Sequence, residues 1–247
     1  MQQLQLAILI AMLSCIATPP ATLRAAEGPT PSKPNILFIL GDDVGRELLA
    51  CYGGESGYRT PRLEQLAASG MRFENCYATP LCSPSRNELL TGRYSFRNYT
   101  NWGHLDPKQL TFAQLLRDAG YATAIAGKWQ LRGWDESPPR IVQAGFQDYC
   151  AYVNEEESEK FAAPLGNQYW GGMYMSNGVA AKLDRYGDDV FTDMLVQFMK
   201  RNREKPFLAY YCMGLMHRPF QPTPEHPQAP RAGQPAPESW RGLRGQA

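Results

Sequence analysis

Cys82 opens a short segment, Cys-Ser-Pro-Ser-Arg, whose residue types suit nucleophilic chemistry on an anion. Pro84 is well placed in the first turn of a helix, where its missing N–H costs no hydrogen bond. The helix is predicted to stop near Gly92, so Cys82 would lie at a helix N-terminus whose free amides attract anions. Arg86 is an always-charged donor that can return toward the nucleophile. The alternative to a nucleophilic role is that Cys82 is a buried structural cysteine before a helix that begins with proline.

Two adjacent carboxylates, Asp42 and Asp43, follow a mostly apolar run over 35–40 and then Gly41. Such a run is typical of a strand buried on both faces. Ligand sites in open α/β sheets gather at the carboxyl ends of strands, where two carboxylates can converge on a hard cation. An Asp-Asp pair can equally be a turn or a helix N-cap.

Polar residues also follow two further predicted strands. Lys128 comes just after a strand predicted over 121–126, with Gln130 two positions on, and His217 comes after a strand predicted over 206–211. If these strands lie parallel in one sheet, their ends share an edge, and the three side chains can face one crevice. A surface lysine and a structural histidine are the alternatives at these positions.

The elements that must position these residues alternate between strand and helix. Strands are predicted over 35–40, 71–77, 121–126 and 206–211, and helices over 60–70, 82–92, 111–120 and 188–198. Thr111 and Gln114 form a capping box at the start of one helix. This alternation predicts an α/β sandwich with a mostly parallel central sheet flanked by helices.

Length and composition limit the class of protein but do not indicate a particular reaction. With 247 residues and a net charge of +1, it can bury a core, and it offers no electrostatic case for nucleic acid. Residues 1–26 read as a secretory signal peptide too short for a stable membrane span, with acylation of Cys15 as a lipoprotein as the alternative. A linker is expected over 27–33, a domain over 34–220 and a proline-rich tail over 221–247. Pairing among the cysteines is open.

Four segments, over 33–43, 82–93, 127–132 and 216–220, together resemble the N-terminal part of the sulfatase family, which has the alkaline-phosphatase-like fold. The resemblance implies that Cys82 is oxidised to formylglycine, whose hydrate attacks the sulfate ester. It also implies that Asp42, Asp43 and the modified Cys82 bind calcium, and that Lys128 and His217 contact sulfate. Gln130 replaces a histidine of the family pattern, and it cannot shuttle protons near neutral pH.

The resemblance further implies a sulfuric ester hydrolase acting on a sulfated small molecule or glycan, and a formylglycine-generating enzyme as maturation partner. Export would make the chain secreted or periplasmic. The family's remaining metal ligands, an Asp-Asn pair, and a second lysine follow the histidine element, but this sequence has no Asp, Asn or Lys after His217. We therefore expect a truncated form, its C-terminal part missing, with impaired activity. An inactive pseudo-sulfatase fragment and a phosphomonoester or phosphonate-ester hydrolase of the same fold stay open.

Overall fold

The computed structural model describes residues 33–54, 59–154, 167–227 and 229. The predicted signal peptide, the linker up to residue 32 and the tail from residue 230 lie outside the described residues. The described strands are β1 (Ile36–Leu40), β2 (Ala122–Lys128), β3 (Asp148–Tyr152), β4 (Met173–Ser176), β5 (Val179–Lys182) and β6 (Phe207–Cys212). The helices are α2 (Pro61–Ser69), α3 (Cys82–Thr91), α4 (Ser95–Asn98), α5 (Phe112–Asp118), α6 (Arg140–Gln143) and α8 (Gly187–Arg201), with short 3₁₀ turns η1 (Arg46–Leu48) and η2 (Ala50–Tyr52).

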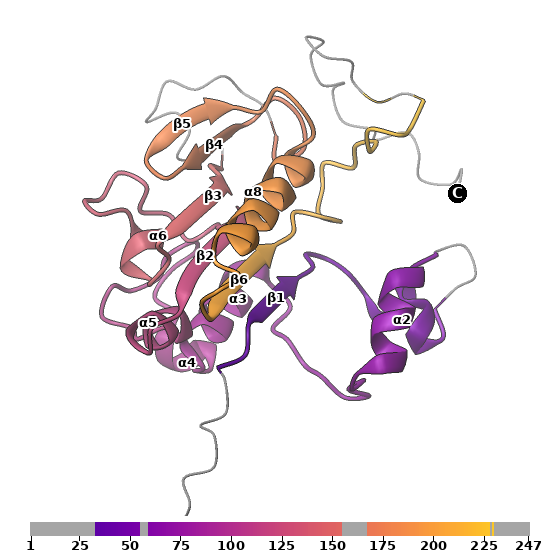
Figure 1. Cartoon of the computed structure of the whole chain (residues 1–247), viewed down its shortest axis with the longest axis horizontal. Helices are drawn as coiled ribbons and strands as arrows, with labels where there is room; N and C mark the ends of the chain where they lie inside the picture. The colour runs from indigo at the N-terminus through magenta and orange to yellow at the C-terminus, as the bar shows by residue number, and fades with distance from the viewer. Residues whose placement is uncertain (1–32, 55–58, 155–166, 228, 230–247) are drawn as a thin grey trace, which may run out of the picture. The chain divides into compact units, whose positions relative to one another are not determined.

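The strands form one sheet in the order β1-β6-β2-β3-β4-β5 (Figure 1). The four strands β1, β6, β2 and β3 run parallel, whereas β4 and β5 are antiparallel to their neighbours. The prediction of a mostly parallel α/β sheet is confirmed. The β4–β5 hairpin was not predicted, although its turn is Asn177-Gly178 with both φ angles positive, a strong hairpin signal.

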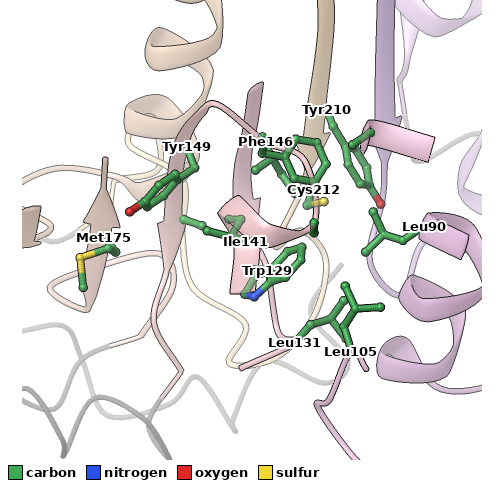
Figure 2. Packing of buried hydrophobic residues seen from close by; sticks show 14 of the residues in the cluster. Leu90, Leu105, Trp129, Leu131, Ile141, Phe146, Tyr149, Met175, Tyr210 and Cys212 are labelled. Atoms are coloured by element: carbon green, nitrogen blue, oxygen red, sulfur yellow. The ribbon is translucent and has the colours of Figure 1, made fainter. Parts of the chain in front are cut away.

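Both faces of the parallel part carry helices. On one face α8 lies over β2 and β6, as Figure 1 shows, and buries Phe191, Leu195 and Phe198 against the small strand residues Ala124 and Ala209. On the other face, residues of α3, α5 and α6 join a larger aromatic and aliphatic core (Figure 2). Two-sided burial holds for β2 and β6, whereas the prediction that the run over 35–40 is buried on both faces is wrong, because Leu37 and Ile39 of β1 are about half exposed.

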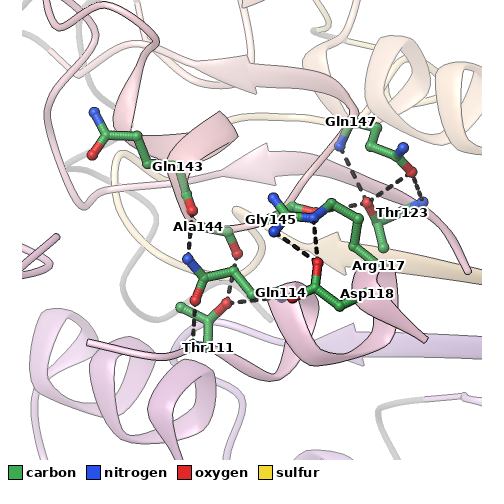
Figure 3. Close-up of polar contacts among 9 residues, drawn as sticks. All are labelled: Thr111, Gln114, Arg117, Asp118, Thr123, Gln143, Ala144, Gly145 and Gln147. Carbon is green, nitrogen blue, oxygen red and sulfur yellow. Dashed lines mark hydrogen bonds and ion pairs between the residues drawn. The ribbon is translucent and has the colours of Figure 1, made fainter. Parts of the chain in front are cut away.

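Side chains fix the start of β2 to the segments around it (Figure 3). Thr111 and Gln114 make both bonds of the predicted capping box, and the Thr111 hydroxyl also donates to Ala144 O at 2.6 Å. The Thr123 hydroxyl donates to Gly145 O at 2.7 Å from the first half of β2. The Thr123 bond joins the start of β2 to the turn that precedes β3.

The strand predicted over 71–77 is wrong, because these residues are irregular and have no strand partner in the described structure. Met71, Phe73 and Tyr77 are largely exposed, so their apolar character did not signal a buried strand. The segment is attached instead by side chains, for example by the Tyr52 hydroxyl, which donates to Phe73 O at 2.9 Å.

None of the helices in the described part of the chain is long and apolar enough to cross a membrane. The cysteines at positions 51, 76, 82, 150 and 212, which are all described, are free thiols.

Candidate active site

The carboxyl ends of β1, β6 and β2 meet at one edge of the sheet. In the register, Leu40 of β1 and Gly127 of β2 are both partners of Cys212 in β6. Beyond the strands, the backbone N–H of Asp42 donates to Leu215 O at 2.9 Å, and the N–H of Met216 donates to Asp42 O at 2.5 Å. The loop after β6, which carries His217, is therefore bonded to the loop after β1, which carries Asp42.

Asp42, Arg86 and Lys128 form a buried charge cluster at this edge. The Arg86 Nη2 lies 3.1 Å from Asp42 Oδ2, and Lys128 Nζ contacts the same oxygen. Arg86 Nη1 also donates to the backbone carbonyl of Lys128 at 2.7 Å. The exposed fractions are 5% for Asp42, 3% for Arg86 and 7% for Lys128, so water screens these contacts little.

The surroundings of Arg86 keep it charged. Burial is the largest single effect and lowers its pKa, whereas nearby acidic groups raise it: Cys212, Tyr210, Asp42 and Cys82. The net pKa of Arg86 is raised, so the guanidinium is a fixed cation. For the Cys212 thiol the effect of burial has the opposite sign: it raises the pKa, so the thiol stays neutral in the core below the site.

Cys82 is the first residue of α3, as predicted from Pro84 and Gly92. The preceding Leu81 is extended, and Gly92 ends the helix in the left-handed region at φ 63°. Cys82 is half-buried. The first turn of a helix has free backbone amides, and Arg86 lies in the same part of α3. This arrangement favours the binding of an anion beside Cys82.

The turn after β2 is held by a buried tryptophan. Trp129 packs in the core between Phe146 and Leu131 (Figure 2). Its ring N–H donates to Arg132 O at 3.1 Å. Gly127 has φ 101°, and a Cβ there would lie 1.9 Å from the Cys212 carbonyl oxygen, so only glycine fits. Lys128, the last residue of β2, thus reaches the cluster from the end of the strand.

Gln130 lies in the same turn with a left-handed φ of 57°. Its buried Oε1 has no hydrogen-bond partner among the described side chains and backbone groups. The structure therefore leaves one buried amide oxygen unbonded two residues beyond Lys128.

His217 is half-buried, and its ring contacts its own neighbour. Its Nδ1 lies 2.7 Å from Arg218 O. A carbonyl oxygen can only accept, so Nδ1 carries the proton in this contact and Nε2 is left for acid–base chemistry. The backbone of His217 is held by Tyr169, whose hydroxyl donates to His217 O at 2.5 Å.

Tyr169 and the adjacent Gln168 were not predicted as site residues. They lie 45 and 46 positions before Gly214, to whose carbonyl oxygen both donate. No local spacing could signal contacts over that separation, and the segment lacks a motif of its own.

Asp42 and Asp43 offer the type of ligand that calcium prefers, but too few ligand oxygens to complete its coordination shell. Carboxylate oxygens are the donors that Ca²⁺ prefers, yet the ion takes about six to eight oxygens. Asp43 is exposed with a left-handed φ of 59°, and Asp42 already faces two cations. Within the described ranges, no three His, Cys, Asp or Glu side chains are grouped so that they could hold a metal ion. These residues offer part of a coordination shell.

The structure therefore joins the sequence-predicted residues to different degrees. Asp42, Arg86 and Lys128 are in direct contact. Cys82 begins the helix that carries Arg86, and the His217 loop is bonded to the backbone of Asp42. Parallel strand ends, a helix N-terminus and buried cations thus share one edge of the sheet.

Comparison with family models gives a match to the family described as Sulfatase over residues 34–243. An N-acetylglucosamine-6-O-sulfatase from Bacteroides thetaiotaomicron is 34% identical over 222 residues, which cover 86% of this chain and 37% of that protein. The human N-acetylgalactosamine-6-sulfatase is 33% identical over 215 residues, with 76% of this chain and 40% of that protein covered. The chain thus spans well under half the length of these relatives.

Solved structures agree with this likeness. A structure solved with its substrate D-glucosamine-2-N,6-O-disulfate superposes with a TM-score of 0.66 at 32% identity, covering 78% of this chain and 36% of that one. The crystal structure of Ps i-CgsB gives a TM-score of 0.67 at 26% identity, covering 78% and 48%. A phosphonate monoester hydrolase of Agrobacterium radiobacter, at 22% identity and a TM-score of 0.51, shows a shared fold alone.

Proposed function

The chain belongs to the sulfatase family, and we propose that it acts in the hydrolysis of sulfate monoesters, with Cys82 as the source of the nucleophile. The observation that carries this proposal is the buried contact of Asp42 with Arg86 and Lys128 beside the helix that begins at Cys82. Cations held at a helix N-terminus are suited to an anionic, tetrahedral group.

We propose that Cys82 is converted to formylglycine by a formylglycine-generating maturation enzyme. The segment from Cys82 to Arg86, which that enzyme would recognise before the chain folds, supports this assignment. The hydrated aldehyde would supply one hydroxyl for attack on sulfur and a second whose deprotonation releases sulfate.

The residues around Cys82 would act by fixed charge and proton transfer. Arg86 and Lys128 would bind the sulfate oxygens and stabilise the charge that develops on them. His217, whose Nδ1–H bonds Arg218 O, would take up a proton at Nε2 and, as the imidazolium, would give that proton to the leaving oxygen. Gln130 would donate a hydrogen bond from its amide but would transfer no proton.

Asp42 and Asp43 would hold a calcium ion, which would supply a strong positive charge at the sulfate when bound. Two carboxylates leave the shell incomplete, so further ligands would come from outside the described residues. We therefore expect weak calcium binding and low turnover for the 247 residues alone.

The substrate is proposed to be a sulfated glycan or a sulfated small molecule. The names of two relatives, which refer to 6-sulfated amino sugars, support this class. The apolar segment near residue 10 supports export of the chain to a secreted or periplasmic location, where such substrates occur.

Peptide mass spectrometry tests the nucleophile. After co-expression with a formylglycine-generating enzyme, the peptide containing Cys82 should lose mass, as conversion of a thiol to an aldehyde requires. Exposed Cys76 is the internal control and should keep its thiol mass. An unmodified Cys82, with the maturation enzyme active on a reference substrate, contradicts the assignment.

An aryl-ester assay tests the reaction class. Sulfate and phosphate esters of one phenol are compared, and the matched variants are Cys82→Ala and Cys76→Ala. We expect a low sulfatase rate that Cys82→Ala abolishes and Cys76→Ala leaves unchanged. A phosphate ester cleaved faster than the sulfate ester supports the phosphohydrolase alternative, and activity that survives Cys82→Ala refutes the mechanism.

A further inference from the structure

Three consecutive side chains before β4 donate hydrogen bonds to the loop that carries His217. Gln168 Nε2 donates to Gly214 O at 3.3 Å, and Tyr169 OH is 2.7 Å from the same oxygen and 2.5 Å from His217 O. Trp170 Nε1 donates to Pro222 O at 3.1 Å. We call Gln168, Tyr169 and Trp170 the donor triplet. All four contacts end on backbone carbonyls, so the triplet holds the path of the loop rather than any one side chain.

Gly214 is the point at which the loop is clamped. Its carbonyl oxygen also accepts from the backbone N–H of His217 at 3.0 Å, while its own N–H bonds the buried carboxylate of Asp188. A Cβ at Gly214 would lie 3.0 Å from Cδ of Gln168. Hydrogen bonds therefore hold both the N–H and the carbonyl oxygen of Gly214, at the start of the turn that leads to His217.

Tyr169 is the central member of the triplet. It is 2% exposed, and burial raises its pKa, so its hydroxyl stays protonated and remains a donor at neutral pH. Its hydroxyl is the one group of the triplet that contacts the His217 peptide itself. Loss of this hydroxyl would leave the His217 carbonyl without that donor in a partly buried place, where an unmade hydrogen bond is costly.

We propose that Tyr169, assisted by Gln168 and Trp170, is a positioning residue that fixes the backbone of His217 and so orients its imidazole toward a bound sulfate group. This inference rests on the proposed function for the sulfate group, whereas the positioning of His217 can be tested without turnover. Tyr169 acts through His217 and contacts no reacting atom.

A matched pair of hydroxyl deletions isolates the effect. Tyr186 stacks on Tyr169, with ring centroids 6.0 Å apart and planes 14° from parallel. It is also buried, but its hydroxyl has no hydrogen-bond partner within the described part of the chain. Tyr169→Phe and Tyr186→Phe thus remove the same atom from neighbouring rings, and only the first removes bonds to the loop.

The readouts are the imidazole nitrogen signals and the amide exchange rate of His217 in the full chain. Only three histidines are present, so ring signals from ¹⁵N-histidine labelling can be assigned by single substitutions. In Tyr169→Phe we expect the His217 amide to exchange roughly 10-fold faster and the ring to lose its preference for the Nδ1-protonated tautomer. Tyr186→Phe should match the unsubstituted chain. Equal behaviour of the two variants, or acceleration spread evenly over the amides of β2 and β6, overturns the inference.

Titration with inorganic sulfate separates this inference from the proposed function. A shift of the His217 ring signals in the unsubstituted chain, with an affinity about 10-fold weaker in Tyr169→Phe and unchanged in Tyr186→Phe, supports both. If sulfate leaves His217 unaffected in the unsubstituted chain, the assignment of His217 to sulfate fails, and exchange still decides the positioning role. If sulfate binds all three proteins equally and exchange is equal, the positioning role fails alone.

Discussion

Replacing Asp42 by asparagine should destabilise the fold through the two cations that share its carboxylate. Arg86 and Lys128 both contact Asp42 Oδ2, and all three side chains are more than nine-tenths buried. An asparagine amide keeps the shape of the side chain and one acceptor oxygen but carries no charge. The change therefore leaves two buried cations without their counter-ion.

The magnitude follows from that burial. Removing one partner of a buried ion pair costs about 3–5 kcal/mol, and we expect the lower end because the amide oxygen can still accept one bond. With a urea dependence of about 2–3 kcal/mol per molar, the midpoint of unfolding should fall by about 1–1.5 M. Urea titration followed by tryptophan fluorescence and by circular dichroism measures this shift.

Asp43→Asn is the matched control. Asp43 is the next residue, is exposed, and has the left-handed backbone that asparagine tolerates well. Its substitution should change the free energy of unfolding by less than about 0.5 kcal/mol. Equal midpoints for the two variants would show that the buried cluster contributes nothing to stability, and would refute the reasoning.

Three further predictions concern other parts of the chain. Burial raises the pKa of Asp188 above its ordinary value, although hydrogen bonds from Tyr211 and Gly214 lower it. Its contribution to stability is therefore present below about pH 4 and is lost as pH rises through the raised pKa. In urea unfolding between pH 4 and 7, the stability of Asp188→Asn relative to the unsubstituted chain should increase as pH rises, and a parallel pH dependence of the two proteins contradicts this. Asn98 begins an Asn-x-Thr sequon but is 3% exposed, and its amide nitrogen, with two hydrogens, lies within hydrogen-bond distance of three acceptors. Mass spectrometry of the folded chain from a glycosylating host should therefore find no glycan there, and Asn98→Ala should lower the free energy of unfolding in urea by about 1–3 kcal/mol. Leu37 and Ile39 are about half exposed on edge strand β1 and should promote self-association. Light scattering should find less self-association in Leu37→Lys than in the unsubstituted chain. An unsubstituted chain that stays monomeric contradicts this.

Much of the candidate site could be predicted because its residues follow strands or begin a helix. The parallel strands end at one edge, so Asp42 and Lys128 were expected to face one crevice there, and Arg86 was expected to return toward Cys82 at the start of its helix. These expectations need only local patterns and one rule of sheet topology. In the structure Lys128 contacts Asp42, whereas the contact of Arg86 with Asp42 was not predicted.

The remainder depended on contacts that local patterns do not carry. The strand predicted over 71–77 failed because an apolar segment becomes a strand only beside a partner, and none lies next to it in the described structure. Tyr169 meets the loop of His217 across 48 positions of sequence. The sheet order also places β6, the last strand along the chain, between β1 and β2, which no neighbouring residues encode.

The charges at this sheet edge indicate what the site still needs in order to act on a sulfate ester. Arg86 and Lys128 bring two positive charges, and Asp42 and Asp43 together bring two negative ones. The described residues thus balance one another before any substrate enters, apart from the titratable His217. A sulfate ester is itself anionic, so a surplus of positive charge, which these residues do not give, would strengthen its binding. A calcium ion on the two carboxylates would create that surplus and would free Arg86 and Lys128 from Asp42 for the sulfate oxygens. Calcium bound to the two carboxylates should then weaken the coupling between Asp42 and Lys128 that a double-mutant cycle measures.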